Sequence, residues 1–149
     1  MAIKIVTGNL LEDEADALVN AVNTVGIMGK GIALQFKLAF PHNFKIYQQA
    51  CKEKSFVIGE ILAVKDSSVT SGEKLIINFP TKIHWRNPSK YEYIESGLRA
   101  FVKLLEDHNI KSVAMPKLGC GAGGLEWAIV KSMIEQHLAH LPTDIHLYD

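Results

Sequence analysis

The stretch that decides the fold runs Ala17-Leu-Val-Asn-Ala-Val-Asn-Thr-Val-Gly-Ile-Met-Gly-Lys-Gly31, a short apolar strand that leads through a glycine-rich loop into a helix-like segment. A second copy of this pattern follows the apolar residues 113–115 and reads Pro116-Lys-Leu-Gly-Cys-Gly-Ala-Gly-Gly124. Glycines allow bare backbone N–H groups to converge on an anion, and the start of a helix adds a partial positive charge. Two such loops in a compact chain predict a ligand with more than one phosphate.

Short strands alternate with helical segments along the whole chain. We expect strands at Ile3–Thr7, Ala17–Val22, Ile61–Lys65, Lys74–Phe79, Ser112–Met115 and Asp144–Tyr148. We expect helices at Gly31–Phe40 and Phe44–Cys51, and apolar spacing predicts two more over residues 94–105 and 127–141. The pattern predicts an α/β fold, a single domain over residues 1–149 with three α/β/α layers around a central mixed, largely parallel sheet of about six strands. Such sheets bind ligands beyond the carboxyl ends of their strands, where both glycine loops fall.

Charge and composition exclude several classes of protein. The 149-residue chain carries sixteen basic and sixteen acidic residues, so any contact with nucleic acid or a membrane needs a local patch. No apolar run is long enough to span a bilayer, and the N-terminus lacks the apolar core of a signal peptide. Cys51 and Cys120 are far apart, which argues against a disulfide framework. We therefore expect a cytoplasmic, monomeric protein without a membrane partner.

The second loop also satisfies G-x-G-x-x-G through Gly119, Gly121 and Gly124, the spacing of a dinucleotide-binding fold. That fingerprint belongs to a first βαβ unit, whereas only one further strand follows this loop. A complete nicotinamide-binding half does not fit, and we favour phosphate contact by the loop. Cys120 has no His or Asp neighbour in the sequence, so we interpret it as a small residue in a tight loop rather than a nucleophile.

The polar residues of the first loop leave alternatives open. Asn20 and Asn23 lie three apart at a strand exit; one of them can cap the turn, and the other can hydrogen-bond vicinal sugar hydroxyls. Lys30 lies between two glycines and is either a phosphate partner or a solvated loop charge.

Together these segments resemble macrodomains, the ADP-ribose-binding fold, over nearly the whole chain. More narrowly, three segments resemble the DarG-type antitoxin macrodomain: residues 23–36, Asn78-Phe-Pro-Thr-Lys-Ile-His-Trp85 and Gly119-Cys-Gly-Ala-Gly-Gly-Leu-Glu-Trp127. That group removes ADP-ribose from thymidine in DNA and undoes the modification made by its partner toxin DarT. The resemblance implies ADP-ribose and ADP-ribosylated single-stranded DNA as partners, with a DarT-type toxin as a further one. We expect no cofactor and no metal.

The resemblance also implies a role for each loop. The first loop wraps the pyrophosphate and the distal ribose, with Asn23 on the ribose hydroxyls, and the second cradles phosphate from the opposite side. Gly8-Asn9-Leu10 stands where many macrodomains carry Gly-Asp-Ile, whose Asp grips the adenine amino group, so Asn9 departs from the family pattern. The implied ligand-binding residues are Asn9, Leu10, Asn20, Asn23, Gly26, Met28, Gly29, Lys30, Gly31, Thr81, Leu118, Gly119, Cys120, Gly121, Ala122, Gly123 and Gly124.

Lys82 is the candidate catalytic residue. It lies just after the predicted strand Lys74–Phe79, at the end where a ligand binds, and the resemblance assigns it the catalytic role. From the residues alone, an exposed charge at a strand end is the simpler interpretation. With the motif, we predict that its amine attacks the anomeric carbon of the distal ribose or the ring-opened aldehyde. Residues 119–125 contain no Asp, so Glu126, the ligand phosphates or water must supply any acid–base help.

The segment after Lys82 combines cations with an aromatic ring. His84, Trp85 and Arg86 form a mixture that suits single-stranded nucleic acid, because bases stack on aromatic faces and phosphates meet basic side chains. The alternative is that Trp85 anchors the loop on the core.

Three functions follow from these patterns. The leading hypothesis is a hydrolase that removes ADP-ribose from thymidine in single-stranded DNA. The second is a non-catalytic reader of ADP-ribose, and the third is a hydrolase of ADP-ribosylated protein side chains or of an RNA-derived phosphate ester. Lys82 favours the first over the second, and the basic and aromatic segment favours nucleic acid over protein.

Overall fold

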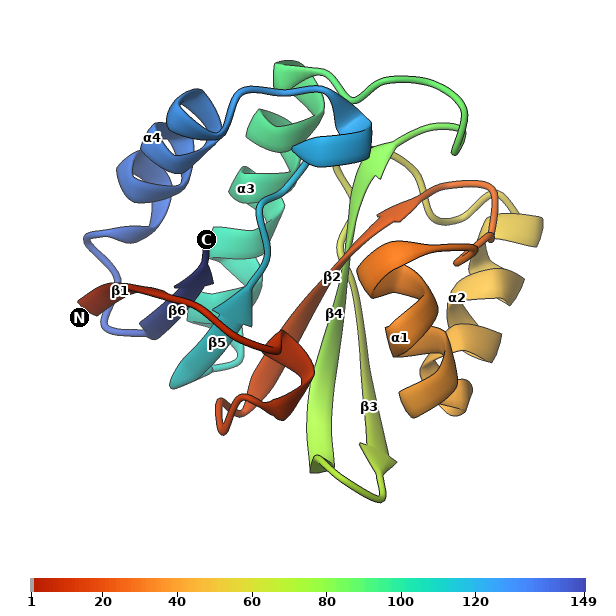
Figure 1. The fold of residues 1–149 in the computed structure, drawn as a ribbon, viewed down its shortest axis with the longest axis horizontal. Helices are drawn as coiled ribbons and strands as arrows, with labels where there is room; N and C mark the ends of the chain where they lie inside the picture. The colour runs from red at the N-terminus through yellow and green to blue at the C-terminus, as the bar shows by residue number, and fades with distance from the viewer. Residues whose placement is uncertain (1) are drawn as a thin grey trace.

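The computed structural model describes residues 2–149, which form a mixed six-stranded sheet (Figure 1). The strands are β1 (Ala2–Val6), β2 (Ala17–Asn23), β3 (Leu62–Ser68), β4 (Gly72–Lys82), β5 (Ser112–Met115) and β6 (Asp144–Tyr148). Their order across the sheet is β1-β6-β5-β2-β4-β3. Neighbouring strands are parallel, except for the antiparallel pair β3 and β4. The predicted mixed, largely parallel sheet is confirmed.

Helices cover both faces of this sheet, which confirms the three layers (Figure 1). The cluster of buried side chains on one face includes residues of α1 (Gly31–Ala39) and α2 (Pro41–Lys52), and the cluster on the other includes residues of α3 (Tyr91–Asp107) and α4 (Trp127–Leu138). Short 3-10 turns occupy Leu10–Glu12 (η1) and Gly121–Gly123 (η2). Neighbouring strand residues serve opposite layers: Val19 packs with α3 and α4, and Leu18 with α1 and α2. No helix within residues 2–149 is long and apolar enough to cross a membrane.

β4 is longer than the sequence predicts, and this changes the place of Lys82. We expected the strand to end at Phe79, but it continues because β2 pairs with it as far as Asn23, which lies opposite Lys82 after a register shift. The expectation that Lys82 follows the strand was therefore wrong. Lys82 is the last residue of β4, and its backbone is held in the sheet.

Two other boundaries also differ from the prediction. α2 begins at Pro41 rather than Phe44, because the fixed φ of proline suits the first turn of a helix. β3 continues to Ser68 rather than ending at Lys65, because its antiparallel pairing with β4 continues to Ser68 opposite Gly72.

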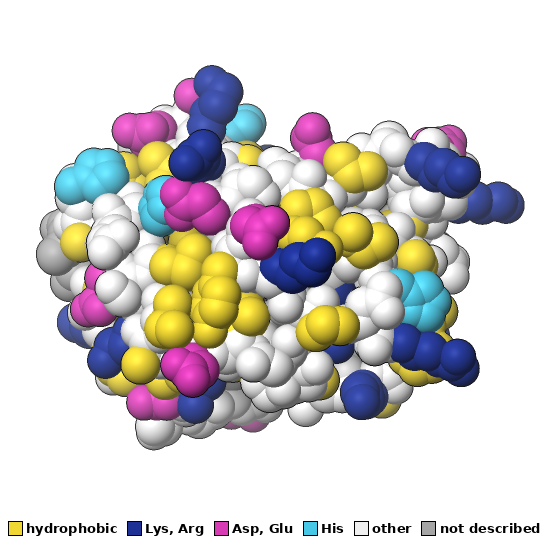
Figure 2. All heavy atoms as spheres, turned by 90° about the horizontal axis from the view of Figure 1, so that it is seen from above, with side chains coloured by type: hydrophobic (Ala, Val, Ile, Leu, Met, Phe, Trp, Pro, Cys, Tyr) yellow, Lys and Arg dark blue, Asp and Glu magenta, His cyan; other side chains and the backbone are white. Residues whose placement is uncertain are grey.

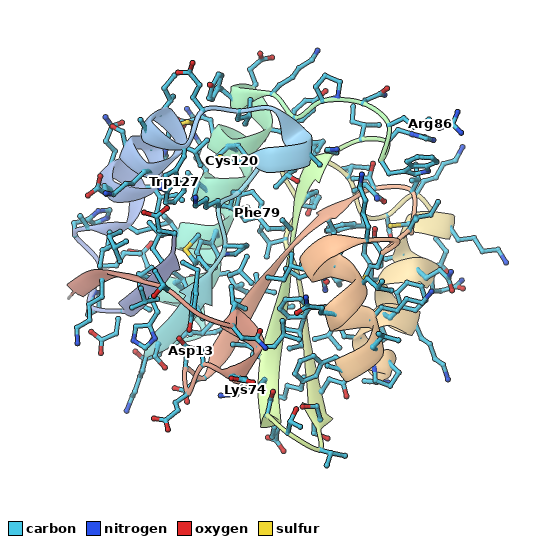
Figure 3. The ribbon with its side chains drawn as sticks, in the orientation of Figure 1. Asp13, Lys74, Phe79, Arg86, Cys120 and Trp127 are labelled. Atoms are coloured by element: carbon cyan, nitrogen blue, oxygen red, sulfur yellow. The ribbon has the colours of Figure 1, made fainter. Side chains whose placement is uncertain are left out.

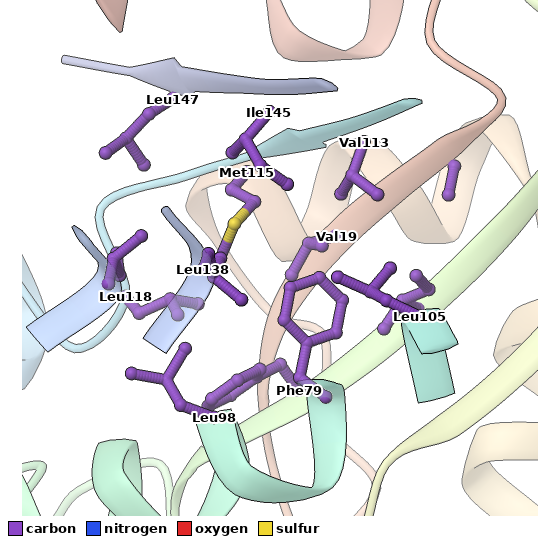
Figure 4. Close-up of a cluster of buried hydrophobic side chains, with 14 of the residues drawn as sticks. Val19, Phe79, Leu98, Leu105, Val113, Met115, Leu118, Leu138, Ile145 and Leu147 are labelled. Carbon is purple, nitrogen blue, oxygen red and sulfur yellow. The ribbon is translucent and has the colours of Figure 1, made fainter. Parts of the chain in front are cut away.

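α3 packs closely against β4 because Gly97 faces the ring of Phe79. A Cβ atom at Gly97 would lie 2.4 Å from Phe79 Cζ, and both residues are buried. Figure 4 shows the Phe79 ring within the buried cluster, between Leu98 of α3 and Val19 of β2. Since Phe79 lies three residues before Lys82, this contact fixes the end of the strand that carries the candidate site.

We expect Gly97→Ala to lower the free energy of unfolding by about 1–3 kcal/mol, because the added methyl group overpacks against a buried ring. The higher helix propensity of alanine, worth up to about 1 kcal/mol, offsets part of this loss. Urea unfolding of Gly97→Ala, Phe79→Leu and the double variant measures the coupling. The smaller Leu side chain should recover part of the loss in the double variant, whereas strictly additive effects would contradict direct contact.

A polar cluster centres on Asp13, which Figure 3 places close to Lys74 and far from Arg86. The Asp13 carboxylate accepts hydrogen bonds from the Tyr148 hydroxyl at 2.7 Å and from the Ala15 N–H at 2.7 Å, and it pairs with Nδ1 of His146 at 2.9 Å. Burial by itself raises the pKa of Asp13, but these three partners together hold that pKa below its ordinary value of 3.8.

We expect Asp13→Asn to destabilise the protein more at neutral pH than in acid. A carboxyl group whose pKa is lowered on folding contributes its full stability above its ordinary pKa and loses it as the pH falls through the lowered value. The loss at neutral pH should be about 1–3 kcal/mol, the range for hydrogen bonds to a charged group. Urea unfolding at pH 7 and at about pH 2.5 tests this. An equal loss at both pH values would mean that the charge of Asp13 does not matter.

Candidate functional site

An open cleft of about 590 Å³ lies between the two glycine loops, at the carboxyl ends of β2, β4 and β5. Figure 2 looks down on this end of the molecule, where hydrophobic and positively charged side chains share the surface. The cleft is lined by Ala21, Val22, Asn23, Ile27, Gly29, Lys30, Gly31, Ile32, Ala33, Thr81, Lys82, Trp85, Ser89, Pro116, Lys117, Gly119, Cys120, Ala122 and Gly123. Two loops that are about 90 residues apart in the sequence therefore face one cavity.

A second hollow of about 560 Å³ adjoins this cleft, because Ile32, Pro116 and Lys117 line both. Asn9 and Leu10 contribute to its wall from the turn after β1. The two hollows together form an elongated site with apolar walls and a few polar groups, the composition of sites that bind small organic ligands.

The structure places most of the sequence-predicted ligand residues in this elongated site. The cleft lining contains Asn23, Gly29, Lys30, Gly31, Thr81, Lys82, Trp85, Gly119, Cys120, Ala122 and Gly123, and the second hollow contains Asn9 and Leu10. Outside both linings lie Asn20, Gly26, Met28, Leu118, Gly121, Gly124, His84 and Arg86. Eight further lining residues were not predicted from the sequence: Ala21, Val22, Ile27, Ile32, Ala33, Ser89, Pro116 and Lys117. Most of these flank the two glycine loops, so proximity to the loops was an available signal.

Asn23 closes the first glycine loop from the inside. Its Oδ1 accepts hydrogen bonds from the N–H groups of Val25 at 3.1 Å and Ile27 at 3.4 Å, and its Nδ2 donates to the Ile27 carbonyl at 2.8 Å. The hydroxyl of Tyr47 donates to the same Oδ1 at 2.9 Å. One hydrogen of Nδ2 is left to face a ligand, so Asn23 both shapes the loop and lines the cleft.

Tyr47 anchors this arrangement from α2. Its side chain is fully buried, and its hydroxyl lies 2.8 Å from the Asn23 carbonyl oxygen as well as close to Oδ1. Burial, followed by the neighbouring Cys51, raises the pKa of Tyr47 far above its ordinary value, so the hydroxyl stays protonated and remains a donor. Tyr47 was not predicted from the sequence, because no motif connects it with Asn23, which lies 24 residues away.

The side chains of Asn20 and Met28 are buried beneath the backbone of the first loop and do not line the cleft. Both are buried, and Asn20 Nδ2 donates to Met28 Sδ at 3.6 Å. Asn20 Oδ1 has no hydrogen-bond partner among the described residues. Of the two asparagines, Asn23 is thus the one that both caps the turn and reaches the cleft, and Asn20 supports the loop from below.

Lys82 joins three parts of the site. Its Nζ donates to the carbonyl oxygen of Trp85 at 3.3 Å and to that of Ala122 at 3.2 Å. Ala122 belongs to the second glycine loop, so the amine lies where β4, that loop and the segment after β4 meet. Its acceptors are neutral carbonyls, and the half-buried side chain lines the cleft.

Carboxylates are absent from the cleft lining in the part of the chain that the structure describes. Glu126, one of the residues considered for acid–base help, stands at the exposed start of α4 outside the lining. Its backbone N–H donates to the Tyr91 hydroxyl at 3.1 Å. Within residues 2–149, the cleft lining therefore places no carboxylate beside Lys82.

The second glycine loop is held tightly against Ser89, which lies two residues before the start of α3. The N–H of Ser89 donates to the Gly123 carbonyl at 2.9 Å, and a Cβ atom at Gly123 would lie 2.5 Å from Ser89 Oγ. The same Ser89 hydroxyl is buried and has no hydrogen-bond partner among residues 2–149. Gly119 and Gly121 have φ values of +74° and +70°, a region that side-chain-bearing residues seldom adopt. Only glycine fits these positions without strain.

Cys120 lines the cleft but lacks the features of a nucleophile. Burial raises the pKa of its thiol, although the charge of Lys117 opposes this change, so the group stays protonated at neutral pH. Its Sγ lies 3.7 Å from the Leu118 carbonyl oxygen. These features agree with a small residue that packs within a tight loop.

Trp85 lies at the edge of the cleft with part of its ring exposed. The His84 ring stacks on it with 5.4 Å between centroids and 28° between planes. The Arg86 guanidinium lies 4.6 Å from the ring centroid. Trp85 is thus part of a small stack of planar groups at the surface rather than a buried anchor.

The fold and the cleft define a class: a three-layer α/β domain in which two glycine loops border a cleft at the carboxyl end of a mixed sheet. Residues 19–134 match the family model of the Macro domain. The chain belongs to the macrodomain family.

Individual relatives confirm the narrower resemblance to DarG-type macrodomains. A DNA ADP-ribosyl glycohydrolase of Thermus aquaticus is 49% identical over 139 residues, which is 93% of this chain and 38% of that protein. The macrodomain of Mycobacterium tuberculosis DarG has 46% identity and a TM-score of 0.94, covering 99% of this chain and 97% of that one. Thermosipho africanus DarTG in complex with ADP-ribose has 37% identity and a TM-score of 0.89, covering 98% of this chain and 41% of that one. The chain thus spans about two fifths of the length of the T. aquaticus relative.

We expect Gly123→Ala to cost about 1–3 kcal/mol of unfolding free energy, because the new methyl group overpacks against Ser89. Ser89→Ala should be neutral or slightly stabilising, because it removes a buried hydroxyl that has no partner in the described part of the chain. In the double variant the loss should be smaller than for Gly123→Ala alone. Urea unfolding of the three variants measures these differences. Full stability of Gly123→Ala, or no recovery in the double variant, would show that the two residues are not in tight contact.

Proposed function

We propose that the protein is a hydrolase that removes ADP-ribose from thymidine in single-stranded DNA. The observation that carries this proposal is the Lys82 amine, which lies between carbonyls of two loops at the edge of a cleft suited to a diphosphate and a sugar. The relative from Thermus aquaticus is named a DNA ADP-ribosyl glycohydrolase. The geometry supports the same reaction here.

ADP-ribose lies along both hollows in this proposal. Its base occupies the hollow beside Asn9 and Leu10, and its diphosphate lies between the glycine loops. α1 begins at Gly31, and Lys30 before it makes no side-chain cap bond within the described residues, so the first N–H groups of the helix are available to an anion. The remaining Nδ2 hydrogen of Asn23 donates to a hydroxyl of the distal ribose.

The distal ribose then meets Lys82. The lone pair of the neutral amine attacks the anomeric carbon of the distal ribose, which carries the bond to the thymine nitrogen. The bond from that carbon to the thymine nitrogen breaks, and its electron pair leaves with the nitrogen, which takes up a proton. Water adds to the lysyl adduct, returns the free amine and releases ADP-ribose. Because no carboxylate lies in the described lining, the proton comes from the ligand's phosphates or from water.

The DNA part of the substrate lies against the segment that follows β4. His84, Trp85 and Arg86 supply planar and cationic groups beside the cleft, and the phosphodiester backbone meets the cations. A DarT-type toxin is the proposed source of the modification, and support comes from the Thermosipho africanus relative, in which a DNA ADP-ribosyl transferase is fused to the glycohydrolase. We propose that the protein acts as a monomer in the cytoplasm.

A non-catalytic reader of ADP-ribose is the second candidate function. One observation favours it: the described cleft lining offers no carboxylate to act as an acid or a base. A reader needs the two glycine loops but does not need the Lys82 amine. The two candidates therefore differ in what they require of that residue.

We expect Lys82→Ala to reduce release of ADP-ribose from a thymidine-modified oligonucleotide at least about a thousandfold, because the nucleophile is lost. The dissociation constant for free ADP-ribose should change by less than about threefold, since the loops that hold the diphosphate remain. Release is followed by chromatography and binding by calorimetry, with Lys82→Arg as a control that keeps the charge but is a poor nucleophile.

Three outcomes decide between the candidates. Equal losses of release and of binding in Lys82→Ala would make the residue a binding contact only. Absence of release by the unmodified protein, together with measurable ADP-ribose binding, would leave the reader. Release from ADP-ribosylated protein but not from modified DNA would assign a protein substrate.

A further inference from the structure

Four large hydrophobic side chains are exposed on the two loops beside the cleft. Val25 and Ile27 belong to the first glycine loop and are 41% and 45% exposed, and Ile83 and Trp85 belong to the segment after β4 and are 49% and 42% exposed. Ile27 and Trp85 also line the cleft. We refer to these four residues as the apolar ledge.

The two halves of the apolar ledge are fixed to one another. The backbone N–H and the hydroxyl of Thr24 both donate to the Ile83 carbonyl, at 3.1 Å and 2.9 Å. Thr24 directly precedes Val25, so these bonds hold Val25 and Ile83 on neighbouring pieces of backbone. Because the loops are joined before any ligand binds, the ledge is a preformed surface and its use costs little ordering.

The surroundings of the ledge are positively charged although the chain as a whole is neutral. Residues 23–31 and 80–90 contain no Asp or Glu. Besides Lys82, they supply the cations Lys30, Arg86 and Lys90. Figure 2 shows the same asymmetry: Lys, Arg and His side chains lie beside hydrophobic ones at the lower right, and the acidic side chains lie mostly to the left. An apolar surface surrounded by cations complements a strand with phosphates outside and exposed bases inside.

Within the apolar ledge, the aliphatic side chains are more open to a ligand than the Trp85 ring is. His84 already stacks on the Trp85 ring, and Arg86 lies over it, so the ring's own faces are partly covered. Val25 and Ile83 have no such cover and offer an open apolar contact. A base can use this contact only when it is unpaired, because a duplex presents base edges and backbone rather than base faces.

We propose that the apolar ledge binds the unpaired base of a nucleotide that adjoins the modified thymidine, so that the protein acts on a single strand rather than on an isolated nucleoside. This inference rests on the proposed function and adds the surface that receives the flanking DNA. The modified thymidine enters the cleft beside Lys82, the neighbouring base covers Val25 and Ile83, and Arg86 and Lys90 meet the phosphates on either side.

The test compares two substrates, ADP-ribosylated thymidine as a mononucleoside and the same group within a single-stranded decamer. The variant is Val25→Ser with Ile83→Ser, and the matched control is Leu38→Ser with Val69→Ser, which changes two exposed apolar residues on the end of α1 and on the turn between β3 and β4. We expect kcat/KM for the decamer to fall about five- to twentyfold in the ledge variant, while kcat/KM for the mononucleoside stays within about twofold. The control should change neither value.

A binding arm keeps the ledge separate from catalysis. Fluorescence anisotropy of the labelled, modified decamer is measured on Lys82→Ala with and without the two ledge substitutions, and a duplex decamer is measured beside it. Weaker binding of the single strand in the ledge variant, with no change for the duplex, supports the ledge proposal. This holds even if the unmodified protein shows no turnover, an outcome that would contradict the proposed hydrolysis but not the ledge. Unchanged decamer binding, or equal losses for decamer and mononucleoside, overturns the ledge proposal. Unchanged DNA binding with lost binding of a DarT-type toxin would assign the ledge to a protein partner instead.

Discussion

The site depends on the pairing of β2 with β4, which continues beyond Val22 and Phe79, where the sequence pattern predicts that the two strands end. The pairing continues through a register shift at Val22/Asn23 and sets Asn23 opposite Lys82. Asn23 organises the first glycine loop, and Lys82 donates to the Ala122 carbonyl in the second. One strand pair therefore fixes the distance between the Asn23 amide and the candidate nucleophile Lys82. Backbone hydrogen bonds in a sheet hold such a distance more firmly than side chains on mobile loops do.

Hydrogen bonds within the two loops decide which groups remain for a ligand. Asn23 uses its oxygen and one of its two amide hydrogens inside the protein, and Tyr47 keeps that oxygen in place. Lys82 uses two carbonyls, and both belong to segments that contact the substrate in the proposed function. Through the Ala122 carbonyl, the position of the Lys82 amine is linked to the position of the second loop. In the proposed function, two hydrogens of the amine bind these carbonyls, and its lone pair stays free to attack the sugar.

Local chemistry made much of the fold and part of the site predictable. The alternation of strands and helices can be predicted from the sequence, and so can the glycine loops, because each depends on a few neighbouring residues. The end of β4 was not predictable, because pairing with a strand 60 residues away extends it. The roles of Tyr47 and Ser89 were equally hidden, since each contacts its loop across a long sequence separation and neither belongs to a motif. The stack of His84, Trp85 and Arg86 shows the same limit, because sequence proximity revealed the residue types but not that they cover one another.

In the hollow lined by Asn9 and Leu10, one departure from the family pattern, Asn9 in place of Asp, leaves the fold intact. Asn9 accepts a hydrogen bond from the Leu11 N–H at 3.1 Å and caps η1, a role that Asp fills equally well. The exchange therefore keeps the turn while it removes a negative charge from the hollow. A neutral amide oxygen binds an amino group less strongly than a carboxylate does. In the proposed function, the base then gains more from the apolar walls of Leu10, Ile32 and Pro116, and the glycine loops supply a larger share of the affinity.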